Sequence, residues 1–148
     1  MASPDEDLIR ELQGREPEYV SYKVDAAGRV VAVHCSCAKN IDKLAPGIGS
    51  LKHLEVLDCQ LSDVLDRGLT HSTRLSNLRR IVLTNTRVTG AGLASLTKLT
   101  SLRELHCNPK EEADLGLKHI RPTSKSASSR TYLFRRYGRR AASINKSD

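Results

Sequence analysis

Apolar residues recur with a period of 24 along the middle of this 148-residue chain. Three aligned columns carry the pattern: Leu54, Leu78 and Leu102; Leu57, Ile81 and Leu105; and Cys59, Leu83 and Cys107. A Gly-Leu pair recurs at one further phase, as Gly68-Leu69, Gly92-Leu93 and Gly116-Leu117. Two unrelated stretches of the unit agree on one period, which indicates an array of stacked, equivalent units.

The fullest unit runs from Leu78 to Leu93 and reads LRRIVLTNTRVTGAGL. It resembles leucine-rich repeats of about 24 residues, a variant common in bacterial proteins and close to the cysteine-containing repeats of F-box adaptors. The resemblance covers residues 30 to 120, about four copies, with a weaker first copy and an atypical last one. It implies an α/β class fold, a short solenoid with parallel strands on the concave face and helices or helical turns on the convex face.

The 24-residue phase divides the chain into three parts. Residues 1–28 are predicted to form an N-terminal cap, with a short helix over 4–12, a strand over 19–24 and a turn over 25–28. Residues 29–120 hold the repeats, the first strand covering 29–35, and residues 121–148 form a tail without periodicity. Helix and hairpin together would cover the open apolar end of the stack.

Acidic residues recur just before the expected helical return of each unit. Asp42, Asp66 and Asp114 stand at equivalent positions, and Thr89-Gly90 fill that place in the third copy. A carboxylate before a helix accepts hydrogen bonds from free backbone N–H groups. We therefore expect these residues to be helix N-caps.

The net charge of +7 is concentrated in the tail. Residues 121–148 hold eight Lys or Arg against one Asp, so residues 1–120 carry 16 charges of each sign. Guanidinium groups and rings alternate there, a composition that can neutralise phosphates and stack on bases. The candidate polyanion-binding residues are Arg130, Tyr132, Arg135, Arg136, Tyr137, Arg139 and Arg140.

Other interpretations of the tail stay open at this stage. It can lie on an anionic membrane surface, be a solvated extension, or follow a reading-frame change that truncated a longer array. Its Ser-rich beginning predicts disorder in isolation, and Thr131 to Ile144 can form a basic helix once their charges are neutralised.

The four cysteines raise a metal or redox hypothesis. Three of them, Cys35, Cys59 and Cys107, fall in the inward column, where a thiol packs as a small apolar group. Cys37 is out of that phase, so the C-x-C is no preformed pair, and zinc sites usually combine two pairs of ligands. We expect core thiols, no metal and no cofactor.

The strand residues between the inward positions form three outward columns: Ala32, Val56, Arg80, Glu104; His34, Asp58, Val82, His106; and Ser36, Gln60, Thr84, Asn108. Neighbours within a column predict two ion pairs, His34 with Asp58 and Arg80 with Glu104. The candidate partner-binding residues on this concave face are His34, Val56, Asp58, Gln60, Arg80, Val82, Thr84, Glu104 and His106. The alternative is a solvated sheet face without a partner.

We predict a protein-protein interaction module that binds an unidentified protein on this face. The alternative is an accessory nucleic-acid-binding protein that uses its Arg-rich tail. The nearest catalytic sets, His34 with Asp58 and Cys37 or His106 with Glu104, lack a phosphate loop or nucleophile elbow, so we expect no enzyme. No leader or membrane-spanning run is seen, and the expectation is a cytoplasmic monomer without a membrane span.

Overall fold

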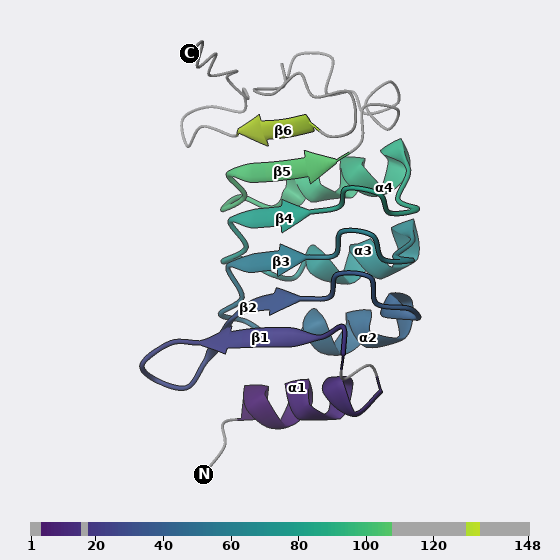
Figure 1. Cartoon of the computed structure of the whole chain (residues 1–148). Coiled ribbons are helices and arrows are strands. Elements are labelled where there is room, and N and C mark those ends of the chain that lie inside the picture. Colours follow the sequence, from purple (N-terminus) through teal and green to yellow (C-terminus); the bar gives the residue numbers. More distant parts are fainter. Residues whose placement is uncertain (1–3, 16–17, 108–129, 134–148) are drawn as a thin grey trace, which may run out of the picture.

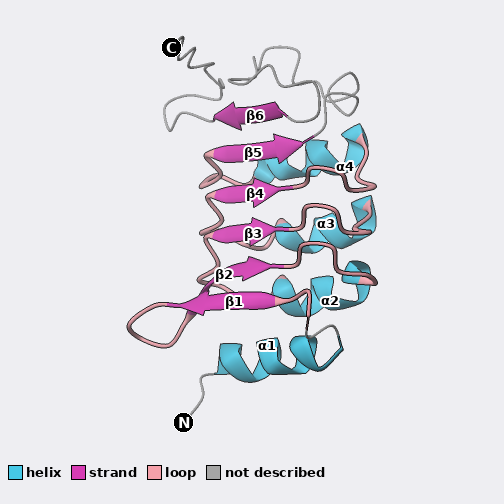
Figure 2. Cartoon of the chain, in the orientation of Figure 1, coloured by secondary structure: helices cyan, strands magenta, loops and turns pink. Residues whose placement is uncertain are grey.

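The computed structural model describes residues 4–15, 18–107 and 130–133. They form a mixed α/β structure in which one open, mostly parallel sheet of six strands is covered by helices on one side (Figures 1 and 2). The helices are α1 (Pro4–Arg15), α2 (Ile41–Ile48), α3 (Asp66–Ser72) and α4 (Gly90–Ser95), which continues as a 3₁₀ turn, η1 (Leu96–Lys98). The strands are β1 (Ser21–Val24), β2 (Val30–His34), β3 (Val56–Asp58), β4 (Arg80–Val82), β5 (Glu104–Cys107) and β6 (Arg130–Leu133).

Strands β2 to β5 are parallel, and each is displaced from the next by one 24-residue unit. Ala32 pairs with Val56, Val56 with Arg80, and Arg80 with Glu104. The alignment of strands predicted from the period is therefore confirmed. Because each strand is followed by a helix that lies behind the sheet, α2, α3 and α4 stack in the same order as β2, β3 and β4 (Figure 1).

The core lies between the sheet and the helices. Alternate strand residues point toward the helices, and the three that the period aligned, Leu57, Ile81 and Leu105, are all buried, as is Val33, which pairs with Leu57. The inward thiols Cys35, Cys59 and Cys107 are buried as predicted, whereas Cys37 is exposed. A hydrogen bond with the Cys35 thiol, reinforced by burial, raises the pKa of Cys59 well above its usual value.

The N-terminal segment forms the helix and hairpin expected of it. Helix α1 lies beside α2 at one end of the sheet (Figure 1), and β1 pairs antiparallel with β2. Asp25 orders the connecting turn, because its Oδ1 accepts the Ala27 and Arg29 backbone N–H groups at 2.8 and 3.0 Å. The Arg29 side chain and these N–H groups lower the pKa of Asp25 to about 2.

The predicted N-cap role of the repeated aspartates is wrong for Asp42 and Asp66. Both residues lie in the first turn of a helix, and neither caps its own helix. Each carboxylate instead reaches the next helix: Asp42 Oδ1 accepts the Leu65 N–H at 3.1 Å, and Asp66 Oδ1 accepts the Thr89 N–H at 2.7 Å. Sequence phase located these residues but could not show that their acceptors serve the neighbouring unit. Asp114 lies outside the described residues.

The repeated glycine is explained by the same contact. A Cβ atom at Gly68 would collide with Asp42 Oδ1, and one at Gly92 would collide with Asp66 Oδ1. Only a residue without a side chain lets adjacent helices approach closely enough for these carboxylate bonds. In the first copy the equivalent position is Leu44, which is buried in α2. The helix that precedes α2 in the stack is α1, which carries no aspartate of the repeated column.

The other end of the sheet differs from the sequence expectation. Residues 130–133, predicted to be disordered or part of a basic helix, form β6, which pairs antiparallel with β5 from Glu104↔Leu133 to Cys107↔Arg130. The open edge of β5 offers unpaired backbone groups that can order an extended segment, a tertiary effect that local composition does not reveal. The remainder of 108–148 lies outside the described residues.

Candidate functional site

The face of the sheet turned away from the helices carries the residues predicted to bind a partner. We call it the open face and define it by two rows that follow the strand pairing: Lys23, Ala32, Val56, Arg80, Glu104; and Ser21, His34, Asp58, Val82, His106. Ser36, Gln60 and Thr84 extend it at the carboxyl ends of β2, β3 and β4. The predicted columns are thus brought together on one surface, apart from Asn108, which lies outside the described residues.

Exposure varies along this face. Arg80 and Gln60 are exposed, and His34, Val56, Asp58, Thr84, Glu104 and His106 are partly buried. Val82, also predicted to contact a partner, is only 8% exposed, because it lies between Asp58 and His106 in its row. Its side chain therefore offers little surface, and any contact with it would be made through the flanking polar groups.

His34 and Asp58 form the first of the two predicted ion pairs. His34 Nδ1 lies 3.7 Å from Asp58 Oδ2, and both side chains remain partly accessible to solvent. The other carboxylate oxygen of Asp58 accepts the Gln60 N–H at 3.0 Å, which fixes its orientation. Partly exposed pairs of this length contribute little to stability, but they leave a hydrogen-bonding group in a defined position.

Glu104 joins the second predicted pair to a histidine. Its Oε2 lies 3.4 Å from Arg80 Nε and 3.5 Å from His106 Nε2, so the carboxylate lies within ion-pair distance of both side chains. Burial lowers the pKa of His106, and the charge of Arg80 lowers it further, while Glu104 opposes both effects. The open face therefore combines a cation, a carboxylate and an imidazole within two adjacent strands.

Two residues of the open face were missed by sequence reasoning. Ser21 pairs with His34, and Lys23 with Ala32, so β1 adds one more strand to both rows. The alternation of Tyr22 and Val24 with Ser21 and Lys23 was a usable signal. The antiparallel register needed to align them with the repeats was not available from a 24-residue period.

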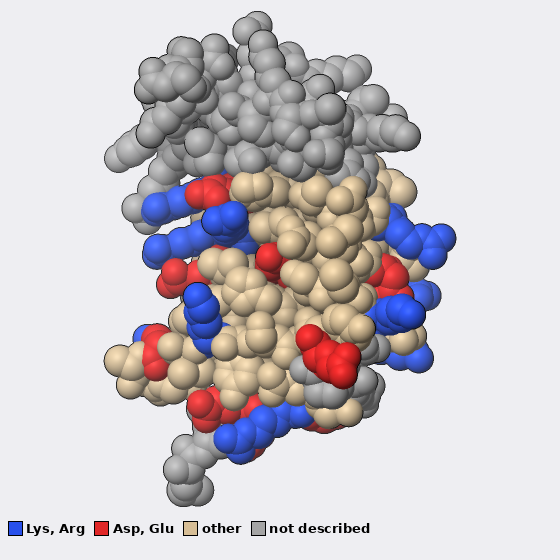
Figure 3. Space-filling model, viewed as in Figure 1, with Lys and Arg blue, Asp and Glu red and all other residues tan. Residues whose placement is uncertain are grey.

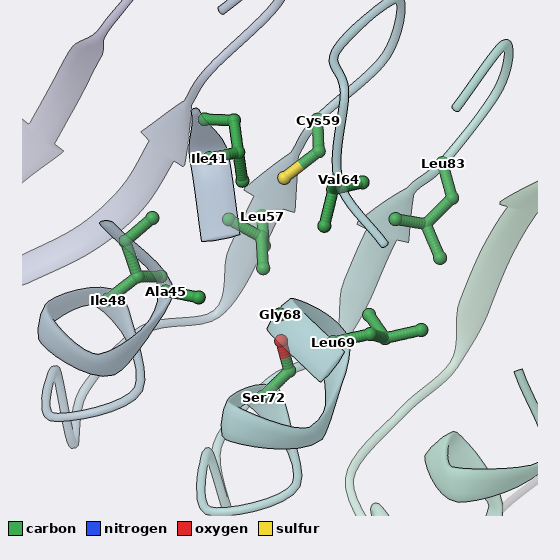
Figure 4. A pocket seen from close by; sticks show the side chains of 10 residues that line it. All are labelled: Ile41, Ala45, Ile48, Leu57, Cys59, Val64, Gly68, Leu69, Ser72 and Leu83. Atoms are coloured by element: carbon green, nitrogen blue, oxygen red, sulfur yellow. The ribbon is translucent and has the colours of Figure 1, made fainter. Parts of the chain in front are cut away.

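The interior offers no room for a small-molecule ligand at the cavity between α2, α3, β3 and β4. This cavity has a volume of about 10 Å³ and a mostly apolar lining (Figure 4), formed by Ile41, Ala45, Ile48, Leu57, Cys59, Val64, Gly68, Leu69, Ser72 and Leu83. Such a space holds at most one water molecule, whereas ligand pockets are far larger. The candidate site is therefore the surface of the sheet.

Of the side chains weighed earlier for chemistry, His34 lies beside Asp58 and His106 lies beside Glu104. Cys37 follows β2 in a left-handed turn (φ 63°) and is exposed, whereas His34 belongs to the strand and contacts Asp58. Among residues 4–15, 18–107 and 130–133, no group of three or more His, Cys, Asp or Glu side chains is arranged to hold a metal ion.

Of the candidate polyanion-binding residues, Arg130 and Tyr132 lie within the described part of the chain. Arg130 and Tyr132 belong to β6, where only the backbone is described, and Arg135, Arg136, Tyr137, Arg139 and Arg140 lie outside the described residues. The pairing of β6 shows where the chain leaves this strand. Because Leu133, the last residue of β6, pairs with Glu104, the first residue of β5, the chain leaves β6 at the side of the sheet where β5 begins.

No family model matches the chain, and no curated protein matches it significantly. Within the described part of the chain, no helix combines the length and the apolar character needed to cross a lipid bilayer.

Proposed function

We propose that the chain is a short leucine-rich-repeat solenoid that acts as a protein-protein interaction module and binds its partner on the open face. The uniform 24-residue step between β2, β3, β4 and β5 supports the repeat assignment. The Asp-Gly contacts that join α2 to α3 and α3 to α4 support it as well, because they recur with the same step. The open face would be the concave side of this solenoid.

The observation that carries the binding role is the continuity of the open face across the repeats. Two rows of side chains run from β1 to β5 without interruption, and they include the Arg80-Glu104 ion pair and the His34-Asp58 pair held in register. A surface that spans several strands can contact an extended protein segment or the side of a folded domain. Fixed donors and acceptors then give orientation, which matters more for specificity than for affinity.

The chemistry of the face defines the partner it would fit. Val56 supplies a partly exposed apolar group, Val82 is almost covered, and the His34-Asp58 and Arg80-Glu104 pairs lie in the same two rows. A matching partner has a small apolar contact between groups of both charges. The rows from β2 to β5 contain no aromatic residue, and aromatic anchors dominate tight interfaces, so we expect modest affinity.

We also infer that the chain binds rather than catalyses. The open face is an exposed sheet surface, and the cavity behind it, about 10 Å³, is too small to enclose and desolvate a substrate. Location in the cytoplasm and a monomeric state remain predictions from the sequence.

The test is quantitative capture of proteins by the immobilised full-length chain, followed by direct titration of each captured protein. Arg80→Glu should reduce affinity for a genuine partner roughly tenfold, with a change in stability within about 0.5 kcal/mol because the side chain is exposed. Arg87→Glu is the matched control, since Arg87 is an exposed arginine in the strand-to-helix segment after β4. A partner equally sensitive to both reversals, or to neither, would contradict binding at the open face.

A tail variant distinguishes the competing function. Replacing Arg135, Arg136, Arg139 and Arg140 by Ala should leave binding to the open face unchanged. This substitution is preferable to deleting residues 121–148, because deletion would also remove β6. If the tail variant abolishes all capture while Arg80→Glu changes nothing, the repeats serve only as a scaffold.

A further inference from the structure

The charges of the repeats, although balanced in number, are unevenly placed. The segments that lead from a helix back to a strand, residues 49–56, 73–80 and 97–104, contain six Lys or Arg and two Glu, a net +4. The segments that lead from a strand to a helix, residues 35–42, 59–66 and 83–90, contain two Lys or Arg and three Asp, a net −1. All six segments lie within the described residues. The side of the sheet where the parallel strands begin is therefore basic, and the side where they end is not.

The excess belongs to the last two of these segments. Arg74 and Lys98 occupy equivalent positions 24 residues apart, and so do Arg79 and Arg103. We call these four residues the basic edge; all four are exposed. Figure 3 shows basic side chains gathered at the left-hand side, near the start of β4. In the first copy, Ser50 and Glu55 stand at the same two positions.

The basic edge places like charges next to each other. The Arg103 N–H donates to the Arg79 carbonyl at 2.8 Å, so these arginines project from neighbouring strand starts about 4.8 Å apart. Like charges in register repel each other. Glu55 lies 3.7 Å from Arg79, but Arg74, Lys98 and Arg103 form no ion pair within the described residues. A bound anion would offset this repulsion.

We propose that the basic edge is a binding surface for the phosphate backbone of a single nucleic-acid strand. Its four charges occupy two positions that each recur in the next unit of the stack, and the surface is open. This arrangement suits an extended polyanion rather than one small phosphate compound. Guanidinium groups bind phosphate in a bidentate manner. The site is separate from the open face and does not depend on the proposed protein-binding function.

Two further observations favour nucleic acid over other anionic partners. The apolar residues of these segments, Leu75, Leu78, Leu99 and Leu102, are buried, so no side chain among them is free to insert into a bilayer. The chain leaves β6 at the side of the sheet where β5 begins, which is the side that carries Arg103. The sequence that follows is rich in arginine and also contains aromatic residues. Rings add stacking on bases, which acidic peptides and membranes do not require.

The experiment uses the full-length chain and a fluorescently labelled single-stranded oligouridylate, with binding followed by anisotropy at a series of salt concentrations. Arg79→Ala with Arg103→Ala should weaken binding roughly tenfold and lower the slope of log K against log salt by about 1.4, or 0.7 for each lost phosphate contact. Arg79→Lys with Arg103→Lys should restore the slope, because the charge is kept.

A matched variant removes the same charge elsewhere. Lys39→Ala with Arg87→Ala takes two exposed cations from the opposite edge and should leave the slope unchanged. An equal loss in this variant would mean that binding follows net charge alone, and would overturn the proposal. So would the absence of binding at low salt, or a wild-type slope in the Arg79/Arg103 variant with binding lost only on replacing the tail arginines.

Parallel titrations with polyglutamate and with phosphatidylserine vesicles test the class of partner. Weak binding to both supports the assignment to nucleic acid. If either binds as tightly as the oligouridylate and depends equally on Arg79 and Arg103, the basic edge serves an acidic protein or a lipid surface instead.

Discussion

Leu57 lies at the centre of the stack, between Val33 on β2 and Ile81 on β4, and is 3% exposed. Truncation to Ala leaves a cavity between two repeats as well as losing apolar contacts, so we expect Leu57→Ala to lower the free energy of unfolding by roughly 2 to 5 kcal/mol in urea titrations. Leu61→Ala is the control, because the same atoms are removed where the residue is 55% exposed. Equal costs at both positions would contradict a continuous core through β3.

The thiols offer a second test of individual positions. Cys35, Cys59 and Cys107 are buried and Cys37 is exposed, and the raised pKa of Cys59 disfavours its reactive thiolate. Native protein treated with iodoacetamide should therefore gain one carbamidomethyl group, at Cys37, and unfolded protein four, as counted by intact mass. Modification of Cys59 at a rate close to that of Cys37 would place the inward column at the surface.

His106 predicts a pH dependence of stability. Its folded pKa lies below the ordinary value of 6.5, because burial and Arg80 disfavour the imidazolium. The unfolded chain therefore takes up this proton first as pH falls below 6.5, and the folded state loses stability until the folded pKa is passed. His106→Gln should remove this part of the decline in melting temperature, whereas replacement of the exposed His53 should not. An identical decline in both variants would assign the effect to other groups.

At the scale of elements, adjacent helices are joined by a carboxylate and a glycine. Asp66 binds the Thr89 N–H at 2.7 Å and the Thr89 hydroxyl at 2.5 Å, and a Cβ at Gly92 would displace that carboxylate. We expect Asp66→Ala and Gly92→Ala each to cost about 1 to 2 kcal/mol, mainly through the same lost bonds. The double variant should then cost clearly less than the two together, as urea titrations in a double-mutant cycle would show.

Gly14→Ala controls for the change of residue type, because a Cβ there would meet nothing within 4 Å. It should be neutral or slightly stabilising, since alanine favours the helix. Additive effects of Asp66→Ala and Gly92→Ala would show that the carboxylate and the glycine act independently.

The sequence predicted the elements best where the period applied. The columns through Leu57 and Ile81 placed β2 to β5 in the correct register, since a parallel stack converts sequence period into spatial alignment. The sequence predicted that Asp66 caps its own helix, which is wrong. Its carboxylate accepts the backbone N–H of Thr89, 23 residues away, just before the next helix. Strand β6 was not predicted, because the free edge of β5 is a property of the assembled sheet.

At the scale of the whole molecule, the candidate surfaces were only partly accessible to sequence reasoning. Outward columns such as the one through Asp58 and Val82 follow from alternation once the strands are aligned. The low exposure of Val82, however, depends on the size and direction of the side chains around it. The basic edge escaped notice because residues 1–120 carry no net charge. Only the fold shows that residues such as Arg79 and Arg103 meet at one edge.

The two ends of the sheet are protected differently, and the difference leads to a final prediction. At one end β1 and α1 directly precede β2 in the sequence, whereas at the other end β5 pairs with β6, which comes from the distant segment 130–133. Deleting residues 121–148 would expose the backbone N–H and C=O groups of β5, and unpaired edges associate with one another. We expect the truncated chain to self-associate with rising concentration in light-scattering chromatography, and the 16.3 kDa full-length chain to stay monomeric.

The tail also contributes charge, which by itself opposes association. The variant with Arg135, Arg136, Arg139 and Arg140 replaced by Ala separates the two effects, because it lowers the charge and keeps the residues of β6. It should remain monomeric at concentrations where the truncated chain associates. If both associate equally, charge rather than β6 keeps the chain monomeric; if neither does, the edge of β5 needs no protection from the tail.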